Sequence, residues 1–495
     1  MSTNHRATVD DQADIVIVGY GPVGATLANL LGQAGVSTLV LEREDAAYHL
    51  PRAVHFDDEC MRVFETIGLA RAIEPIVHVS PGMRFLDAAG RSLLEWPRPA
   101  ERTPMGWHAS YRFHQPDLET ILRDGLARFP SVRVRTRMEA LAVDEDAVGA
   151  TIRCENLSTG NLERIRARYV VGCDGARSLI RRKIGEMPDD LRFDERWLVV
   201  DVLLNRPKPE LGDYSVQHCD PARPATYVRG TGQRRRWEIA LHEHESNAEM
   251  VQPDRVWRLL APWLSPDEAE LERAACYRFQ SMVARPWRLG RLLLAGDAAH
   301  QTPPFLGQGM CAGIRDVANL AWKLERVLSG LDSEALLDSY ETERAPHVRE
   351  YIALAVRLGG LINTKAMQAA LPGGERDGGP VKMESIKPAL GPGLEAGWNG
   401  LPRLVVPQPM LSDGRLLDAH VGYRPALLLR AGIVPDAAEA DRLRNRGVVV
   451  VQDAAPALQD WLSANGIIAA AMRPDRYLLG AARDGAELAA LARQI

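Results

Sequence analysis

Short apolar, β-branched runs followed by glycine-rich turns recur along much of the chain. The first run, Asp14 to Val18, has the composition of a fully buried parallel strand and stops at Gly19-Tyr20-Gly21-Pro22-Val23-Gly24. A helix is predicted from Val23 to about Ala34, and a second buried strand from Val36 to Leu41, with Glu42 at its end. Strand, helix and strand in this order predict one unit of a parallel α/β sheet.

Two further buried strands end in glycine turns of the same kind. Arg168 to Cys173 leads into Asp174-Gly175-Ala176-Arg177-Ser178, and Arg291 to Ala295 leads into Gly296-Asp297-Ala298-Ala299-His300. A loop with open backbone amides follows, and then a long helix from Met310 to about Leu328 with one apolar face. Ligands bind at the carboxyl ends of strands in open α/β sheets, so the three turns predict one large ligand that spans the sheet.

Between about Leu191 and Trp287 the pattern changes to short alternating runs rich in Val, Trp and Tyr. This alternation predicts an antiparallel sheet inserted into the first fold, where it would form a wall of a substrate pocket. From about Leu411, alternating β and α segments predict a small third unit. The predicted division has α/β segments at residues 12–80, 112–190 and 289–362, inserted segments at 81–111 and 191–288, a linker at 363–410 and a C-terminal unit at 411–495.

The spacing Gly-x-Gly-x-x-Gly after the first strand is a dinucleotide-binding pattern. Gly19 permits the tight turn, Gly21 lets a pyrophosphate approach the backbone, and Gly24 lets the helix pack closely on the sheet. The phosphates are expected on the positive N-terminus of the helix, and Glu42 is expected on a ribose. A loop arginine, Arg52, is placed to reach the phosphates.

Composition narrows the classes of function. The chain has 495 residues, 46% of them hydrophobic, so two or three domains are expected. A formal net charge of −5 with scattered arginines gives no support for nucleic-acid binding, and no apolar run reaches the roughly 18 residues of a membrane span. Residues 1–11 lack the apolar core of a signal peptide. The six cysteines form no Cys-x-x-Cys pair, which argues against a metal site and predicts a reducing, cytoplasmic location.

Taken together, the three glycine motifs resemble those of the flavin-dependent aromatic hydroxylases, the class A flavoprotein monooxygenases typified by para-hydroxybenzoate hydroxylase. The resemblance covers about residues 12–360 and includes Leu306-Gly307-Gln308-Gly309-Met310. The chain is most similar to the 3-(3-hydroxyphenyl)propionate hydroxylase branch, in Pro51-Arg52-Ala53, Cys219 to Pro224 and Met472 to Asp475. The resemblance implies a Rossmann-like FAD-binding domain with an inserted antiparallel-sheet substrate domain and a thioredoxin-like C-terminal domain.

The resemblance implies roles for individual residues toward FAD. Glu42 would bind the adenosine ribose, and Arg43 or Arg52 would bind its phosphates. Gln115 would contact the phosphate or ribityl region, and Asp174 would lie behind the pyrophosphate, in a motif that serves both FAD and NAD(P)H.

Asp297 would hydrogen-bond the ribityl chain, and the backbone from Gly307 to Gly309 would face the isoalloxazine ring. The implied cofactor-binding residues are Gly19, Gly21, Pro22, Val23, Gly24, Glu42, Arg43, Arg52, Gln115, Asp174, Gly296, Asp297, Gly307, Gln308, Gly309 and Met310.

The implied reaction is hydroxylation of a phenol ortho to its hydroxyl group, with NAD(P)H as electron donor, dioxygen as oxygen source and FAD as cofactor. Formation of the phenolate requires a base or polar relay near the phenol oxygen, and an arginine would stabilise the anionic flavin or a substrate carboxylate. The candidates in the inserted segment are His218, Tyr227, His242 and His244 for the proton, and Arg223 and Arg236 for the negative charge.

Several alternatives stay open from the sequence. Hydroxylases of larger polyketide or antibiotic substrates share the three motifs, and a flavin oxidase, a dehydrogenase or a non-catalytic flavin-binding scaffold would keep the phosphate motifs. A flavin halogenase is disfavoured because the chain lacks a Trp-x-Trp-x-Ile-Pro segment. The ring substituents, the choice between NADH and NADPH and the formation of a homodimer are left open. No cysteine follows Cys311, so the C-terminal unit is expected to serve packing or dimerisation rather than dithiol chemistry.

Overall fold

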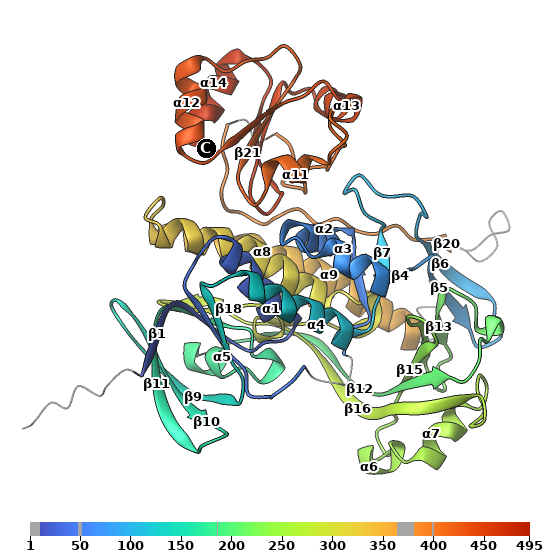
Figure 1. Cartoon of the computed structure of the whole chain (residues 1–495). Helices are drawn as coiled ribbons and strands as arrows, with labels where there is room; N and C mark the ends of the chain where they lie inside the picture. The colour runs from blue at the N-terminus through green and yellow to red at the C-terminus, as the bar shows by residue number, and fades with distance from the viewer. Residues whose placement is uncertain (1–9, 48–51, 186, 364–380, 398–399) are drawn as a thin grey trace, which may run out of the picture.

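A computed structural model describes residues 10–47, 52–185, 187–363, 381–397 and 400–495 of the chain. Pro51 and parts of the predicted linker at 363–410 lie outside the described residues. The described residues form a larger body built on two main sheets, and a smaller C-terminal unit packs over its helices (Figure 1).

The first main sheet has eight strands in the described part of the chain. They are β1 (Asp11–Val18), β2 (Thr38–Leu41), β8 (Val132–Arg135), β9 (Met138–Asp146), β10 (Gly149–Asn156), β11 (Asn161–Gly172), β17 (Arg288–Leu289) and β18 (Leu292–Leu294). The order β18-β11-β1-β2-β8 is parallel throughout, and β17, β10 and β9 add antiparallel pairs. Ile15, Val16 and Ile17 are completely buried, as expected for a central parallel strand.

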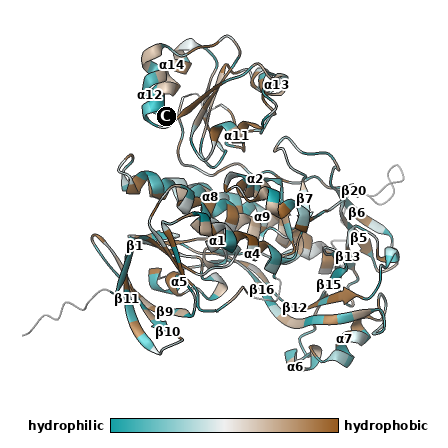
Figure 2. Ribbon diagram, in the orientation of Figure 1, coloured by the Kyte–Doolittle hydropathy of each residue, from teal (hydrophilic) through white to brown (hydrophobic). Residues whose placement is uncertain are grey.

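Helices cover this sheet and connect its strands (Figure 1). They are α1 (Pro22–Gln33), α2 (Asp58–Thr66), α3 (Ala70–Ile73), α4 (Gln115–Asp124), α5 (Leu179–Ile184), α8 (Gly309–Leu328) and α9 (Ser339–Asn363). The helices predicted at 23–34 and 310–328 are thereby confirmed to within one residue at each end. Helix α8 carries polar as well as apolar positions (Figure 2), and its polar residues Arg315, Asp316, Asn319 and Lys323 are buried.

The second main sheet has nine strands among the described residues, in the order β19-β16-β12-β15-β14-β13-β5-β6-β20. Their bounds are β5 (Gly82–Asp87), β6 (Ser92–Pro97), β12 (Asp189–Leu204), β13 (Ser215–Cys219), β14 (Ala225–Arg229), β15 (Arg234–Ala240), β16 (Ala269–Val283), β19 (His300–Gln301) and β20 (Val381–Lys382). Its pairings from β16 to β14 are antiparallel, as the alternating pattern predicted. A separate small sheet joins β3 (His55–Asp57), β7 (Ser110–Arg112) and β4 (His78–Val79).

Because side chains alternate along a strand, the second sheet has two faces with different partners. On the outer face, Trp237 belongs to a cluster with Val256 of α7 (Pro253–Leu260), which follows the short α6 (Asn247–Met250). On the inner face, Trp197 belongs to a cluster with Phe305, in the loop before α8, and with Leu358 of α9. The inner face of the second sheet therefore packs against the loop before α8 and against α9, one of the helices that cover the first sheet.

The C-terminal unit is a small α/β structure, as predicted. Its sheet has the order β22-β21-β23-β24, with β21 parallel to β22 and antiparallel to β23. The strands are β21 (Ala426–Leu429), β22 (Val449–Gln452), β23 (Ala469–Met472) and β24 (Leu478–Ala482), and the helices are α11 (Leu417–Val421), α12 (Ala437–Asn445), α13 (Pro456–Ala464) and α14 (Gly485–Gln494). Leu427 and Leu428 are completely buried on its two sides.

Candidate functional site

The three glycine turns lie next to one another at the carboxyl edge of the first sheet. Gly19 N–H donates to the Leu41 carbonyl at 2.9 Å, at the end of β2. Cys173 N–H donates to the Val18 carbonyl at 2.8 Å, and Ala295 N–H donates to the Gly172 carbonyl at 3.0 Å. The expectation that motifs far apart in the sequence share one sheet edge is confirmed.

The glycines of the first turn differ in the space around them. A Cβ on Gly19 would lie 2.4 Å from the Cys173 carbonyl oxygen, and a Cβ on Gly24 would lie 2.1 Å from the Gly19 carbonyl oxygen. A Cβ on Gly21 would have no described atom within 4 Å. Gly21 is the N-cap of α1, so an open space lies at the positive end of this helix, where a phosphate fits.

Acidic and basic side chains follow β2. The Glu42 carboxylate accepts hydrogen bonds from Tyr20 N–H at 2.8 Å and from Glu44 N–H at 2.9 Å, which fixes it beside the first glycine turn. Arg43 is exposed and pairs with Glu44 at 2.9 Å, so its guanidinium points to solvent in this structure.

Gln115 holds the loop that carries Arg52. Its side-chain oxygen accepts from Arg52 N–H and Ala53 N–H, each at 2.8 Å, and its amide donates to Glu119 at 2.7 Å. Burial raises the pKa of the Glu119 carboxyl, although the hydrogen bond from Gln115 opposes the shift. The Gln115 side chain thus positions the Arg52 backbone through a buried polar pair.

Two aspartates of the second and third turns carry oxygens that lack a protein donor. Asp174 accepts from Leu179 N–H at 2.6 Å through one oxygen, while its other oxygen is buried without a hydrogen-bond partner among the described residues. The Asp297 side chain is solvent accessible and has no hydrogen-bond partner in the described chain. Desolvation by the surrounding protein nevertheless raises its pKa, so the carboxylate is accessible but enclosed by neighbouring protein atoms.

Arg181 joins the second turn to the third. Its guanidinium donates to the carbonyls of Ala298 at 3.0 Å and Ala176 at 2.6 Å. His300, which follows the third motif, is completely buried and bonds to Asp316 at 2.7 Å. These contacts link the two turns into one edge and place His300 inside the protein.

The loop before α8, residues 303–309, is called the Gly307 loop below. Gly307 has a φ of +63°, and a Cβ there would lie 3.0 Å from His55. The Gln308 side chain turns inward, donating to Asp57 at 3.1 Å and accepting from Arg315 at 3.1 Å. A Cβ on Gly309 would meet no described atom within 4 Å, and Met310 is half-buried. The loop therefore offers its backbone, not the Gln308 side chain, to a ligand.

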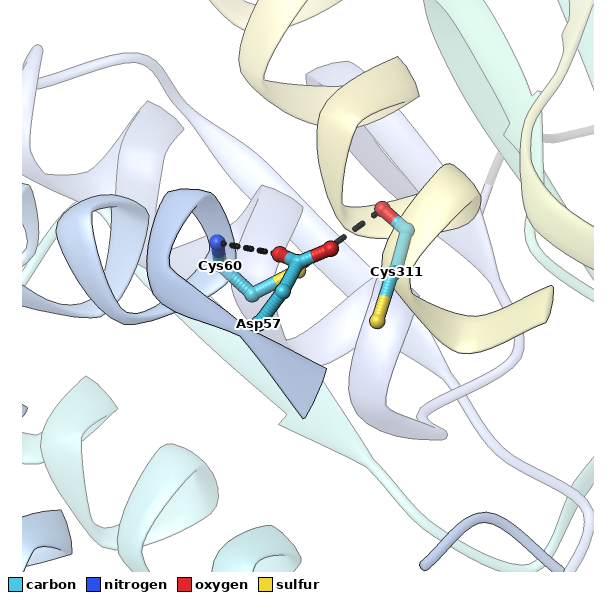
Figure 3. A group of neighbouring side chains, drawn as sticks. All are labelled: Asp57, Cys60 and Cys311. Atoms are coloured by element: carbon cyan, nitrogen blue, oxygen red, sulfur yellow. Dashed lines mark hydrogen bonds between the residues drawn. The ribbon is translucent and has the colours of Figure 1, made fainter. Parts of the chain in front are cut away.

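Asp57, Cys60 and Cys311 have ligand atoms within 4.8 Å of one another (Figure 3), which raises the question of a metal. The Asp57 carboxylate already accepts hydrogen bonds from Arg315, Gln308 and Cys60 N–H. Burial raises the pKa of the Cys60 thiol well above its usual value, so a thiolate is disfavoured. The Arg315 guanidinium supplies the positive charge that a metal ion would otherwise supply. Asp57, Cys60 and Cys311 therefore belong to a hydrogen-bond network.

Of the candidates in the inserted sheet, Arg236 is the one that reaches the cofactor-side loop. It pairs with Asp201 at 2.7 Å and donates to the Arg52 carbonyl at 2.8 Å. Arg223 instead pairs with Glu245 at 2.8 Å, and this hydrogen bond lowers the pKa of Glu245 to about 2.

The structure places His218 and Tyr227 on the outer face of the second sheet, away from Arg236 and Glu238. The His218 ring lies 5.2 Å from the Trp263 ring, and the Tyr227 ring lies 5.2 Å from Trp237 in the outer-face cluster. The Tyr227 hydroxyl donates to the Gly212 carbonyl at 3.4 Å. Both side chains face α7 and its connections. His242 and His244 stack on each other at 5.6 Å in the loop after β15.

The sequence analysis did not identify three ionisable residues, Glu238, Arg112 and His55, that lie between the inner face of the second sheet and the Gly307 loop. The Glu238 side chain, on the same face of β15 as Arg236, makes no hydrogen bond among the described residues; burial raises its pKa, and the charge of Arg236 partly offsets this. The Nε atom of Arg112 is buried without a partner in the described chain, and burial together with the charge of Arg98 lowers its pKa to about 10. Burial and the charge of Arg112 lower the pKa of His55 to about 3, so this imidazole is neutral.

Sequence patterns point to two of these three residues, Glu238 and Arg112, but not to His55. Glu238 is two positions from Arg236, so it shares its face of the strand by alternation. Arg112 lies three residues before Gln115, which the resemblance implies as a cofactor-binding residue. His55 has no local signal, because its approach to Gly307 joins positions 252 residues apart.

Comparison with known proteins shows which family this chain belongs to. A family model described as FAD binding domain matches residues 12–355. The chain is 38% identical to a probable NADH-specific resorcinol 4-hydroxylase of Rhodococcus jostii (strain RHA1), over 97% of this chain and 94% of that protein. It is 40% identical to a 3-(3-hydroxy-phenyl)propionate/3-hydroxycinnamic acid hydroxylase of Mycobacterium avium (strain 104), over 78% of this chain but 66% of that longer relative.

Among solved structures, a ternary complex of aklavinone-11 hydroxylase with FAD and aklavinone has a similar fold. The TM-score is 0.81 at 20% identity, over 98% of this chain and 99% of that one. None of the described helices combines the length and the apolar character needed to cross a membrane.

Proposed function

This chain belongs to the flavin-dependent aromatic hydroxylases that share the FAD binding domain, and on that premise we propose that it hydroxylates a small phenol ortho to its hydroxyl group. Each turnover would consume one phenol, one dioxygen, one NADH and one proton, and would release the hydroxylated phenol, water and NAD⁺. NADH is proposed as donor because the Rhodococcus relative is named NADH-specific. The substrate is proposed to be resorcinol-like or 3-(3-hydroxyphenyl)propionate-like, after the two relatives' names.

The observation that carries this proposal is the shared sheet edge. The open space at Gly21, the unpartnered Asp174 oxygen and the accessible Asp297 carboxylate follow one another along adjacent strand ends. A dinucleotide, whose phosphates lie between two parts that carry hydroxyl donors, fits that sequence of groups. FAD supplies electron transfer from the nicotinamide and activation of dioxygen when bound.

The protein residues would bind and orient this cofactor. Glu42, fixed by two backbone amides, keeps its carboxylate beside the first turn, where ribose hydroxyls can donate to it. Asp297 would accept from the ribityl hydroxyls, and Arg52 would reach the phosphates from the loop held by Gln115. The backbone at Gly307 and Gly309 would face the ring.

On the substrate side, Glu238 is the proposed proton acceptor for the phenol hydroxyl. Its carboxylate lies on the inner face, 3.8 Å from Arg236, and its raised pKa makes it a stronger base than an exposed glutamate. Arg112, enclosed but without a partner among the described residues, supplies a positive charge that favours the phenolate. Together these groups would hold the phenol proton on Glu238 and a phenolate close to the charge of Arg112.

We further assign residues 12–80, 112–190 and 289–362 to the FAD-binding domain and 81–111 and 191–288 to the substrate domain. The C-terminal unit, with its β21-α12-β22-α13-β23-β24-α14 order, is proposed to be thioredoxin-like. All six cysteines are free and none belongs to this unit, which supports a packing role over dithiol chemistry.

The test is NADH and NADPH oxidation by the flavin-loaded protein against resorcinol, 3-(3-hydroxyphenyl)propionate and simple phenols, with products identified by mass. The proposal expects a substrate-stimulated rate and a gain of one oxygen with at least one of them. If flavin binds but no small phenol stimulates oxidation, the small-phenol proposal fails and larger polycyclic phenols become the substrates to test.

A further inference from the structure

A buried chain of hydrogen bonds runs from the C-terminal unit to the Gly307 loop. The Tyr477 hydroxyl donates to one oxygen of Glu59 at 2.8 Å. The other oxygen of Glu59 accepts from Arg315 Nε at 2.5 Å, and Arg315 Nη1 donates to the Gln308 side-chain oxygen at 3.1 Å. Three hydrogen bonds therefore connect a tyrosine of the small unit to the residue between Gly307 and Gly309.

Three members of this chain are almost completely shielded from water, and the Glu59 side chain is 16% exposed. Tyr477 and Arg315 are each 3% or less exposed, and Gln308 is 6% exposed. Arg315 also pairs with Asp57, so its charge is balanced from two sides, and the charges of Asp57 and Glu59 raise its pKa well above the usual value despite burial. Hydrogen bonds in such surroundings are strong and directional, so a displacement at one end is transmitted to the other.

The Tyr477 end is itself held rigidly. Arg473, at the start of the same turn, pairs with Glu343 of α9 at 2.8 Å and with Asp475 at 2.6 Å, and all three side chains are buried. Arg476 has a φ of +70° and pairs with Asp418 at 2.9 Å. A left-handed arginine persists only where its surroundings fix it, so the turn presents the Tyr477 hydroxyl in one position.

We propose that Tyr477 is a positioning residue, through which the C-terminal unit fixes the backbone of the Gly307 loop against the flavin ring. The inference rests on the proposed function, because it takes this loop as the backbone that faces the flavin. Tyr477 touches neither cofactor nor substrate in this account; it acts through Glu59 and Arg315 on Gln308. The small unit would then have a part in flavin binding without any redox group of its own.

The test compares Tyr477→Phe with Tyr423→Phe, which makes the same chemical change at the same interface. The Tyr423 hydroxyl donates to the Ala318 carbonyl at 2.7 Å and accepts from Trp322 N–H at 3.2 Å, both backbone groups of α8. Ala318 lies roughly three helical turns beyond Gln308. Among the described residues, no series of side-chain hydrogen bonds connects Ala318 to the Gly307 loop. Tyr423 thus controls for a general loosening of the C-terminal unit.

Hydrogen exchange of residues 303–310 is measured in both full-length variants after removal of FAD, followed by FAD titration. Tyr477→Phe is expected to speed exchange of these amides and to raise the FAD dissociation constant, each about fivefold, while Tyr423→Phe matches the wild type. Equal effects in both variants, or no change in Tyr477→Phe, would overturn the proposal. Should Tyr477→Phe not fold, Glu59→Gln interrupts the same chain and carries the same expectation. If the wild type binds no FAD, the proposed function fails, yet the exchange comparison still decides the role of Tyr477.

Discussion

Gly21 and Gly24 serve different purposes within one motif, and the space around each decides which. Gly24 faces the Gly19 carbonyl, so a methyl group there collides with backbone, whereas Gly21 has a φ of −72° and open space beside it. Gly24 therefore protects the fold, and Gly21 leaves room for a ligand.

Gly21→Ala is therefore expected to leave the melting temperature of the FAD-free protein within about 2 °C of the wild type and to weaken FAD binding at least about tenfold. Gly24→Ala is expected to lower the melting temperature of the FAD-free protein, because a 2.1 Å contact forces α1 away from the turn. Calorimetry and flavin titration of both variants check this. A Gly21→Ala variant that binds FAD normally would show that phosphates do not lie at this helix end.

Asp58 provides a pH-dependent test at the same scale. Burial, with the neighbouring charge of Asp57, raises its pKa to about 6, while Thr103 donates a hydrogen bond at 2.7 Å. The folded state then binds the proton more tightly than the unfolded state, so the free energy of unfolding falls as the pH rises from about 4 to 6.

Asp58→Asn resembles the protonated acid and does not ionise. The variant is expected to gain about 1 to 2 kcal/mol of unfolding free energy over the wild type at pH 8, with the gain vanishing near pH 4. Urea unfolding at the two pH values measures it. A gain of equal size at both would mean that ionisation of Asp58 is not its cause.

At the scale of elements, the inner and outer faces of the inserted sheet have different roles. β15 carries Arg236 and Glu238 on the inner face and Trp237 on the outer face. β14 places Tyr227 in the outer cluster. Strand alternation thus assigns the polar residues of β15 to the substrate side and the Tyr227 ring to the packing side.

Glu238→Gln is expected to lower kcat/KM for the phenol about a hundredfold and to remove the acidic limb of its pH profile, because the amide cannot accept the phenol proton. Tyr227→Phe, on the outer face, is expected to stay within about twofold of the wild type. Steady-state kinetics across pH 5 to 9 test the pair. A large loss of kcat/KM in Tyr227→Phe with no loss in Glu238→Gln would contradict the assignment of the two faces.

The same elements show what sequence can predict. Strand-and-glycine motifs were recognisable because each is local, and the sheet then brought their ends together as parallel strands must. Which face of a sheet a strand residue occupies depends on the register of that strand against its neighbours. The alternating pattern alone therefore does not show that Glu238, rather than His218 or Tyr227, lies on the inner face. The pairing of Arg315 with Asp57 joins residues 258 positions apart, and no local pattern announces it.

At the scale of the whole molecule, the helices α2, α8 and α9 lie between the two main sheets and the C-terminal unit (Figure 1). Their facing side chains form buried ion pairs with that unit, including Arg62 with Asp418 at 2.7 Å and Arg473 with Glu343 at 2.8 Å. Removing one partner of such a pair leaves a buried charge, so the unit is tightly docked rather than tethered. Packing or dimerisation was expected because no cysteine follows Cys311. The connection to the Gly307 loop is visible only in the three-dimensional contacts.

The central claim is that this chain inserts one atom of dioxygen into a phenol. The most direct measurement supplies ¹⁸O₂ and NADH to the FAD-loaded protein with resorcinol or 3-(3-hydroxyphenyl)propionate and determines the isotope content of the product by mass spectrometry. The account predicts a hydroxylated product that carries one ¹⁸O atom, and no label when ¹⁸O is supplied in water instead. A product that takes its oxygen from water, or NADH oxidation with every tested phenol left unchanged, would contradict it.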